Sequence, residues 1–215
     1  MPGNRPRILI ADDHTLIADL CKKLLETEFD VVGVVSDGRT LVRTAEQLRP
    51  DVALIDITMP ILNGLDAGEQ IKAELPRTKL VFLTMNPSAE VAAEAFRRGA
   101  SAYLLKTCAT SELVAAVRQV LRGYTYLSRN ISEDAVNMLC RQEKKMVEED
   151  LRLTKRQREV LQLLAEGRVM KEVADILNMS TRTVAFHKYR IMDVLGAKNG
   201  AELVRYAVRN HMVAA

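Results

Sequence analysis

The chain is poor in the residues that form covalent cross-links. Its 215 residues include three cysteines and no tryptophan, and aromatic residues make up only 4% of the sequence. Cys21, Cys108 and Cys140 are far apart and odd in number. This spacing matches neither a disulfide framework nor a paired zinc-binding motif. We therefore interpret all three as reduced thiols without a cross-linking role.

Long apolar segments are also missing. No apolar run approaches the roughly 20 residues of a membrane span, and the segment from Met1 to Arg7 contains no apolar signal region. We expect a cytoplasmic protein. A hydrophobic content of 48% over 215 residues is enough for two compact domains, each with its own core.

The net charge of +3 is unevenly distributed. Residues 151–215 carry 12 Lys and Arg against 6 Asp and Glu, which gives +6, whereas the rest of the chain carries 19 against 22, which gives −3. A basic C-terminal part favours an anionic partner such as DNA. Solvated helices often carry a similar surplus, so charge alone leaves both interpretations open.

Acidic residues follow two apolar runs near the N-terminus. Ile8–Ala11 precedes Asp12 and Asp13, and Val52–Ile55 precedes Asp56. An acid in this position lies at the carboxyl end of a buried strand, where the chain turns. Three carboxylates that converge on one crevice repel one another, so we expect them to bind a cation.

Short apolar runs alternate with amphipathic helical stretches throughout this half of the chain. The runs are Ile8–Ala11, Val31–Val35, Val52–Ile55, Leu80–Leu83 and Ala102–Leu105. Strands that are apolar on both faces and separated by helices predict an α/β fold, a doubly wound five-stranded parallel sheet. With strand order 2-1-3-4-5, the crevice opens at the carboxyl ends of the first and third strands. Two later runs end in Thr84 and Lys106.

The residues around these strand ends resemble the receiver domain of bacterial two-component response regulators, over residues 5–125. The similarity includes the three acids, Thr84 and Lys106, and also the pairs Met59-Pro60 and Asn63-Gly64 that follow Asp56. Each motif alone is weak: Asp13, for example, could be a helix cap. Their joint order on successive strand ends is specific.

The resemblance implies a phosphorylation site. Asp56 is then the phosphoacceptor, which takes a phosphoryl group from the phosphohistidine of a sensor histidine kinase. Mg²⁺ is held by Asp13, by the Asp56 carboxylate and by the backbone carbonyl of Thr58, and Asp12 contacts it through water. Magnesium neutralises charge on the transferring phosphoryl oxygens.

The resemblance also implies a switch. Lys106 supplies a positive charge to the phosphoryl group, and the Thr84 hydroxyl donates a hydrogen bond to it. Tyr103 is either the aromatic that swings inward as Thr84 moves or a partly exposed strand tyrosine. Met85 is bulkier than the residue found there in many receivers and could slow phosphorylation or hydrolysis.

The C-terminal part predicts a small all-α DNA-binding domain. Residues 126–150 are interpreted as a linker, either an amphipathic helix or a flexible tether. In residues 151–215, Thr154 caps a helix that ends near Gly167. Helices over about Lys171–Leu177 and Thr181–Leu195, joined by a short polar turn, fit a helix-turn-helix.

The same segment resembles the LuxR-type DNA-binding domain. The matching residues are Leu153-Thr154, Arg156, Glu159-Val160-Leu161, Lys171-Glu172-Val173-Ala174, Ser180, Thr183-Val184, His187, Leu195-Gly196 and Glu202-Leu203-Val204. With the receiver in front, the chain is similar to NarL/FixJ-class response regulators. This predicts a transcription regulator that is not a dedicated enzyme and whose partners are a sensor histidine kinase and promoter DNA. In this class the receiver often covers the recognition helix until phosphorylation releases it.

Individual DNA contacts follow from the outward face of the third helix. Ala185, Phe186 and Tyr189 occupy base-reading positions in the family, and none is cationic, which favours thymine methyl contacts over guanine contacts. Cationic residues flank them and are expected to bind phosphates: Arg182, Lys188 and Arg190.

His187 and the last helix each allow a purely structural interpretation. His187 shares the inward helix face, so we expect it to pack there rather than bind metal. The last helix, about Gly200 to Arg209, exposes Val204 and Val208, which form either a small homodimer contact or two isolated apolar side chains on a solvated helix.

Rival functions have specific discriminators. Acyl-homoserine-lactone receptors share the LuxR-type domain, but their ligand pocket typically contains tryptophan, and this chain has none. A haloacid-dehalogenase-like phosphatase needs a second acid two residues after its nucleophile, where Thr58 follows Asp56. A receiver that works without phosphorylation would lack one of the acids.

Overall fold

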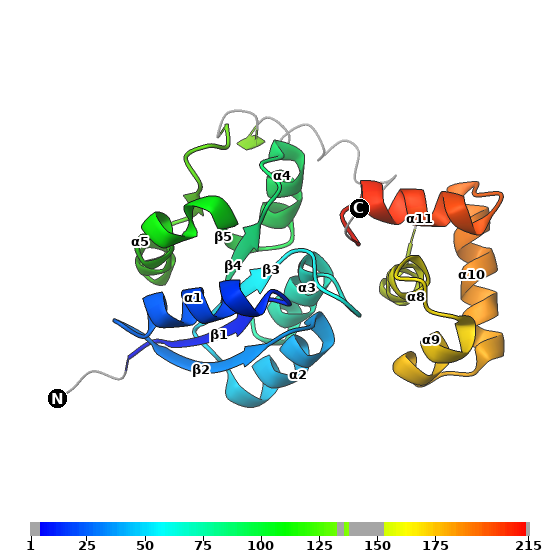
Figure 1. Cartoon of the computed structure of the whole chain (residues 1–215), viewed down its shortest axis with the longest axis horizontal. Helices are drawn as coiled ribbons and strands as arrows, with labels where there is room; N and C mark the ends of the chain where they lie inside the picture. Colours follow the sequence, from blue (N-terminus) through cyan, green and yellow to red (C-terminus); the bar gives the residue numbers. More distant parts are fainter. Residues whose placement is uncertain (1–4, 133–135, 138–152, 214–215) are drawn as a thin grey trace.

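The protein consists of an α/β unit and a smaller helical unit, which lie side by side (Figure 1). The structure is a computed structural model, and it describes residues 5–132, 136–137 and 153–213. The interpretation of residues 126–150 as a helix or a tether concerns mostly 133–135 and 138–150, which lie outside the described residues.

A parallel sheet forms the centre of the first unit. Its strands are β1 (Arg7–Ala11), β2 (Asp30–Val35), β3 (Val52–Asp56), β4 (Lys79–Thr84), β5 (Ala100–Leu105) and β6 (Tyr126–Leu127). They are arranged in the order β2-β1-β3-β4-β5-β6, and every neighbouring pair is parallel. The predicted doubly wound sheet and the order of its first five strands are confirmed.

The sixth strand corrects the prediction of a five-stranded sheet. Tyr126 and Leu127 pair with Ala102 and Tyr103 of β5, and the backbone N–H of Ser128 donates to the Tyr103 carbonyl at 3.0 Å. These residues were predicted to belong to the linker, because a run of two residues is too short to show strand alternation. Only the free edge of β5 makes them a strand.

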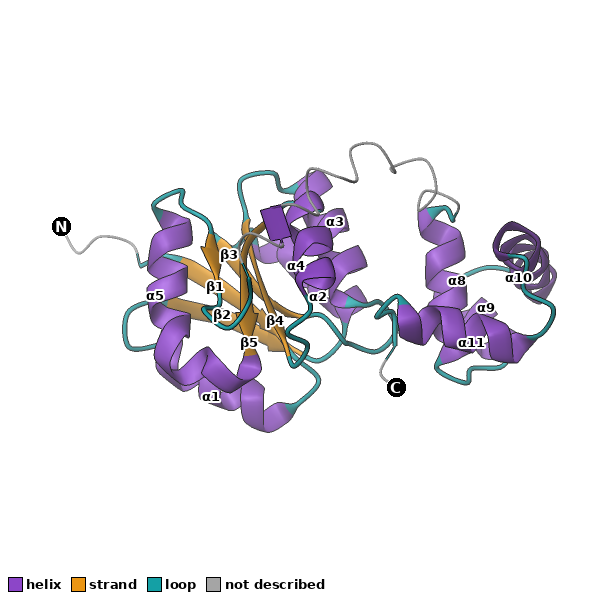
Figure 2. Ribbon diagram, turned by 90° about the horizontal axis from the view of Figure 1, so that it is seen from above, coloured by secondary structure: helices purple, strands orange, loops and turns teal. Residues whose placement is uncertain are grey.

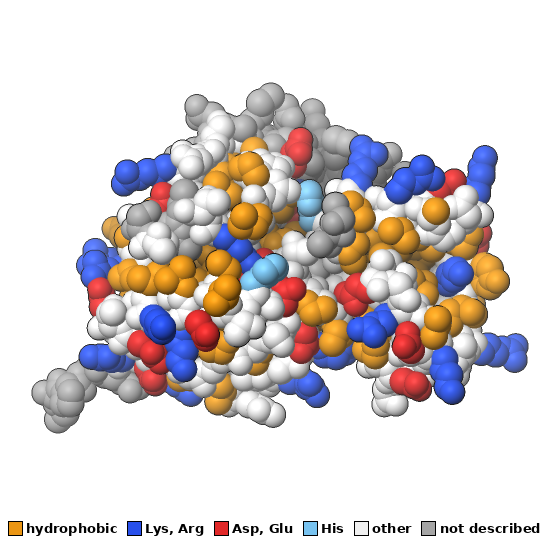
Figure 3. Space-filling model, viewed as in Figure 1, with side chains coloured by type: hydrophobic (Ala, Val, Ile, Leu, Met, Phe, Trp, Pro, Cys, Tyr) orange, Lys and Arg blue, Asp and Glu red, His pale blue; other side chains and the backbone are white. Residues whose placement is uncertain are grey.

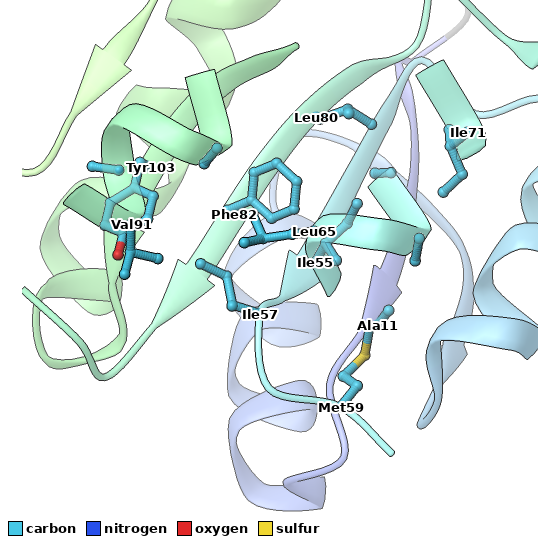
Figure 4. Packing of buried hydrophobic residues seen from close by; sticks show 14 of the residues in the cluster. Ala11, Ile55, Ile57, Met59, Leu65, Ile71, Leu80, Phe82, Val91 and Tyr103 are labelled. Atoms are coloured by element: carbon cyan, nitrogen blue, oxygen red, sulfur yellow. The ribbon is translucent and has the colours of Figure 1, made fainter. Parts of the chain in front are cut away.

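Helices cover both faces of the sheet (Figure 2). One face carries α1 (Thr15–Leu25) and α5 (Ala109–Leu121), and the other carries α2 (Gly38–Leu48), α3 (Gly64–Glu74) and α4 (Ala89–Arg97). Alternate residues of each strand therefore enter separate cores: Ile8 and Ile10 face α1 and α5, whereas Leu9 and Ala11 face the other layer. Figure 4 shows the second core, where Tyr103 of β5 lies beside Val91 of α4.

The second unit contains α8 (Lys155–Ala165), α9 (Met170–Leu177), α10 (Thr181–Leu195) and α11 (Gly200–Arg209). These bounds agree with the predicted helices to within about one turn. Thr154 caps α8 in a capping box with Gln157, and Ser180 caps α10 through the Thr183 N–H. Buried apolar side chains from all four helices form a separate core. In the described part of the chain, no helix combines the length and hydrophobicity needed to cross a membrane.

Candidate functional site

Asp12, Asp56 and Lys106 meet at the carboxyl edge of the sheet. Asp12 directly follows β1, Asp56 ends the neighbouring strand β3, and Lys106 directly follows β5. Lys106 Nζ lies 2.8 Å from Asp12 Oδ2 and 2.9 Å from Asp56 Oδ2. Both acids are almost fully buried. The strand order thus brings one amine and two carboxylates from distant parts of the chain into direct contact.

Burial controls the ionisation of this group. Desolvation raises the pKa of Asp56 to about 6, even though the charge of Lys106 and its hydrogen bond act in the opposite direction. Burial also acts to lower the pKa of Lys106, but the Asp56 and Asp12 carboxylates outweigh it and the net shift is upward. Lys106 therefore stays charged. The charge of Lys106 does not fully offset the cost of burying the ionised Asp56 carboxylate.

Asp13 and His14 complete a cluster on the open side of this group. Asp12, Asp13, His14 and Asp56 each offer one ligand atom, and these atoms all lie within 4.8 Å of one another. Asp12 Oδ2 and Asp56 Oδ2 are buried, and both face the single ammonium group of Lys106. Three clustered carboxylates beside one ammonium group keep an excess of negative charge, which fits a cation site. His14 was not among the predicted site residues, and its only signal in the sequence is its place next to Asp13.

The loop from β3 to α3 explains the Asn63-Gly64 pair. The Gly64 N–H donates to the Ile57 carbonyl at 2.7 Å, and a Cβ on Gly64 would lie 2.0 Å from the Asp56 carbonyl oxygen. Only glycine allows this close approach. Asn63 caps α3 through the Asp66 N–H, and the Thr58 N–H lies 3.3 Å from Asp56 Oδ1. The pair therefore folds the loop tightly against the end of β3.

Thr84 and Tyr103 are linked through Asn86, a residue that the sequence analysis missed. The Asn86 N–H donates to Thr84 Oγ1 at 3.0 Å, and the Tyr103 hydroxyl donates to the Asn86 carbonyl at 2.9 Å. Tyr103 is fully buried, so its interpretation as a partly exposed strand tyrosine is wrong. Helix α4 packs over it, and Leu127 of β6 pairs beside it in the sheet. Burial raises the pKa of its hydroxyl. Met85 is 69% exposed and points away from this core.

Helix α8 holds the β3–α3 loop through Gln162, whose side chain is fully buried. Gln162 Oε1 accepts from the Asn63 N–H at 2.7 Å, and Gln162 Nε2 donates to the Met59 carbonyl at 3.0 Å. The Ile61 N–H donates to Glu166 Oε1 at 2.9 Å. Ile61 has φ 70°, a left-handed conformation that is strained for a β-branched residue. The helical unit, the predicted output unit, thus binds the loop that begins at the candidate phosphoacceptor.

Ion pairs surround this contact. Arg158 of α8 lies 2.9 Å from Asp66 and 3.0 Å from Glu69, both on α3, and Arg39 of α2 lies 3.3 Å from Glu159 of α8. Further along, Asn86 Nδ2 is 3.4 Å from His211 Nδ1 near the C-terminus. None of these interdomain partners was predicted, because the pairing of the two units leaves no local pattern in the sequence.

The predicted recognition helix α10 remains open to solvent. Phe186 is 62% exposed and Tyr189 is 65% exposed, and basic side chains lie along the outer edge of this unit (Figure 3). Of the other predicted contacts, Arg182 and Arg190 are exposed, and Ala185 and Lys188 are half-buried. The expectation that the receiver covers the recognition helix is therefore wrong for this conformation, because the receiver contacts α8 instead.

The remaining predicted positions are His187 on α10 and two valines on α11. His187 is half-buried, its Nδ1 has no hydrogen-bond partner among the described residues, and its ring makes an edge contact with Phe186. On α11, Val204 is 38% exposed and Val208 is half-buried. The structure thus has His187 packed in the helical unit and a small apolar surface on α11.

Comparison with known families identifies both units. Residues 8–118 match the response regulator receiver domain, and residues 151–207 match the LuxR family of bacterial regulatory proteins. The chain therefore belongs to the two-component response regulators, in the NarL/FixJ class, which are transcription regulators rather than dedicated enzymes. It is 34% identical to the transcriptional regulatory protein MctR of Rhizobium johnstonii, over 96% of this chain and 95% of that one. It is 35% identical to the oxygen regulatory protein NreC of Staphylococcus carnosus, over 96% and 99%.

Solved structures of RcsB resemble this chain over nearly its whole length. One RcsB structure from Salmonella typhimurium matches with a TM-score of 0.62 and 27% identity, over 94% of this chain and 96% of that chain. Another, described as two RcsB dimers bound to two parallel DNAs, matches with a TM-score of 0.55 and 28% identity, over 94% and 98%. The predicted class, a DNA-binding transcriptional response regulator, is confirmed.

Proposed function

We propose that the protein regulates transcription after a sensor histidine kinase transfers a phosphoryl group to Asp56. The observation that carries this proposal is the contact of the Asp56 carboxylate with Lys106 at 2.9 Å, beside Asp12, at the open carboxyl edge of the sheet. Folding does not require two further acids and an amine beside a buried carboxylate at this edge, so the cluster indicates a functional site.

Different residues of the chain have separate roles in the phosphoryl transfer. An Asp56 carboxylate oxygen attacks phosphorus, so a P–O bond forms as the P–N bond to the donor histidine breaks, and the donor imidazole keeps the electron pair and takes up a proton. Lys106 holds a positive charge next to the accepting oxygen. Asp13, the Asp56 carboxylate and the Thr58 carbonyl would bind Mg²⁺, with Asp12 through water, and the ion would neutralise charge on the phosphoryl oxygens.

The signal then passes by two routes, both of which start at Asp56. Thr84 would turn toward the phosphoryl group and give up the hydrogen bond from Asn86, which also holds Tyr103. The β3–α3 loop would shift beneath Gln162 and Glu166 of α8. Asn86 also contacts His211 of the helical unit, so both routes end there. Phosphorylation would release α8 from the receiver, a two-state change that favours a DNA-bound homodimer.

On promoter DNA, Phe186, Tyr189 and Ala185 of α10 would contact bases in the major groove. The flanking cations Arg182, Lys188 and Arg190 would bind phosphates. Val204 and Val208 of α11 would form the symmetric contact between the two protomers. Support comes from the exposure of the two aromatic side chains and from the basic character of this unit.

The phosphoacceptor is tested by intact mass after incubation with acetyl phosphate and Mg²⁺. One labile phosphoryl adduct is expected, and it should be missing in Asp56→Asn. A matched control is Asp51→Asn, which changes an acid near the opposite end of the same strand and should leave the adduct intact. An adduct of equal yield in Asp56→Asn would defeat the assignment.

A further inference from the structure

His14 has no role in the function proposed above. It is the N-cap residue of α1, yet its side chain makes no capping hydrogen bond. Its backbone N–H donates instead to Asp12 Oδ1 at 2.9 Å. The imidazole is 65% exposed, so packing does not fix its position either. Neither helix capping nor core packing explains why this ring lies against the acidic cluster.

Three different carboxylates converge on one nitrogen of the ring. His14 Nδ1 lies 2.9 Å from Asp13 Oδ1, 3.4 Å from Asp12 Oδ1 and 3.9 Å from Asp56 Oδ2. Around a cation with bonds of about 2.1 Å, adjacent ligand atoms lie about 3 Å apart and opposite ones about 4.2 Å apart. The separations of Nδ1 from Asp13 and Asp56, 2.9 and 3.9 Å, lie between about 3 and 4.2 Å, so this nitrogen is close enough to join the two carboxylates around one ion.

An ion pair alone explains less of this geometry. Nδ1 carries at most one proton, which can serve one oxygen well, and Asp13 Oδ1 at 2.9 Å fits that description. Asp12 and Asp56 already share the ammonium group of Lys106 and yet also approach the same nitrogen. A metal ion bound by Nδ1, Asp13 and Asp56, with Asp12 contacting it through water, would account for the convergence.

We infer that His14 Nδ1 is an additional ligand of the receiver's cation, and that it shifts the preference of the site from Mg²⁺ toward divalent first-row transition ions. This inference rests on the proposed cation site. Mg²⁺ takes oxygen ligands and keeps several waters, whereas an imidazole nitrogen strengthens binding of the transition ions. His14 therefore determines metal specificity, while the carboxylates provide the basic affinity.

Pulsed electron paramagnetic resonance of the full-length, tag-free protein with Mn²⁺ tests the ligand directly. The wild-type spectrum should show hyperfine coupling to one directly bound ¹⁴N nucleus, and His14→Ala should abolish it. His211→Ala, which removes the other histidine in contact with the receiver, should leave the coupling unchanged. Because His14 is exposed, its substitution should not unfold the protein. Thermal unfolding of each variant checks this.

Metal titrations supply the second measurement. His14→Ala should weaken binding of Co²⁺ and Mn²⁺ by about tenfold or more and change Mg²⁺ affinity by less than about twofold. Mn²⁺ bound without nitrogen coupling, or coupling that persists in His14→Ala, would overturn the inference but leave the carboxylate site intact. If the wild-type protein binds none of these ions, both the inference and the metal part of the proposed function are wrong.

Discussion

The contact of Gln162 with the β3–α3 loop gives the most direct test of coupling between the two units. Truncating this residue to alanine removes the partners of the Asn63 N–H and of the Met59 carbonyl. While α8 stays in contact with the receiver, the closed state, the Asn63 N–H and the Met59 carbonyl would be buried without a partner. When α8 separates from the receiver, the open state, water would satisfy both groups. The substitution should therefore shift the equilibrium toward opening.

The size of the shift follows from the cost of an unsatisfied buried group. That cost is about 1–3 kcal/mol, which corresponds to a change of about 5- to 150-fold in the equilibrium. The remaining ion pairs, such as Arg158 with Asp66 and Glu69, limit the effect.

Amide hydrogen exchange reports this opening at the atoms concerned. In the unphosphorylated wild-type protein, the N–H groups of Asn63 and Ile61 should be protected, because they donate to α8. Gln162→Ala should speed exchange of both by at least about fivefold, and acetyl phosphate should speed it in the wild type. Gln119→Ala, which truncates an exposed glutamine on α5, should change neither. Equal protection in Gln162→Ala and the wild type would refute the coupling.

Three further predictions concern the acidic site and the recognition helix. Asp13→Ala should abolish Mg²⁺ binding and phosphorylation together, measured by calorimetry and intact mass; survival of either at wild-type strength would exclude Asp13 as a ligand. Asp56→Asn should raise the free energy of unfolding by about 1–3 kcal/mol above pH 6 in metal-free buffer. Burial raises the pKa of Asp56 from 3.8 to about 6, so the ionised carboxylate destabilises the folded state above pH 6. The gain should therefore disappear as the pH falls toward about 4, and a pH-independent gain in urea titrations would contradict this cause. Phe186→Ala and Tyr189→Ala should change the preferred DNA sequence, each at about 1–3 kcal/mol of discrimination. Lys188→Ala should instead lower the salt slope by about one. Selected-site binding at two salt concentrations checks this, and a changed sequence preference in Lys188→Ala alone would reverse the assigned orientation of α10.

The sequence by itself determined the sheet and the convergence of its strand-end residues. Parallel strands bring their carboxyl ends to one edge, so Asp12, Asp56 and Lys106 had to meet once the apolar runs were recognised as strands. The helices of the output unit were equally accessible, because caps such as Thr154 and Ser180 are local signals that act within a few residues.

Only the tertiary structure decided which surfaces meet. The Asn63 N–H and Gln162 are 99 residues apart, and no local periodicity records a contact between units that each fold around their own core. The same holds for β6, which is a strand only because β5 offers a free edge, and for His14, whose ring orientation depends on three carboxylates from two strand ends. Local patterns encode the elements and their caps, whereas side-chain contacts between distant elements arise only when the packed chain brings them together.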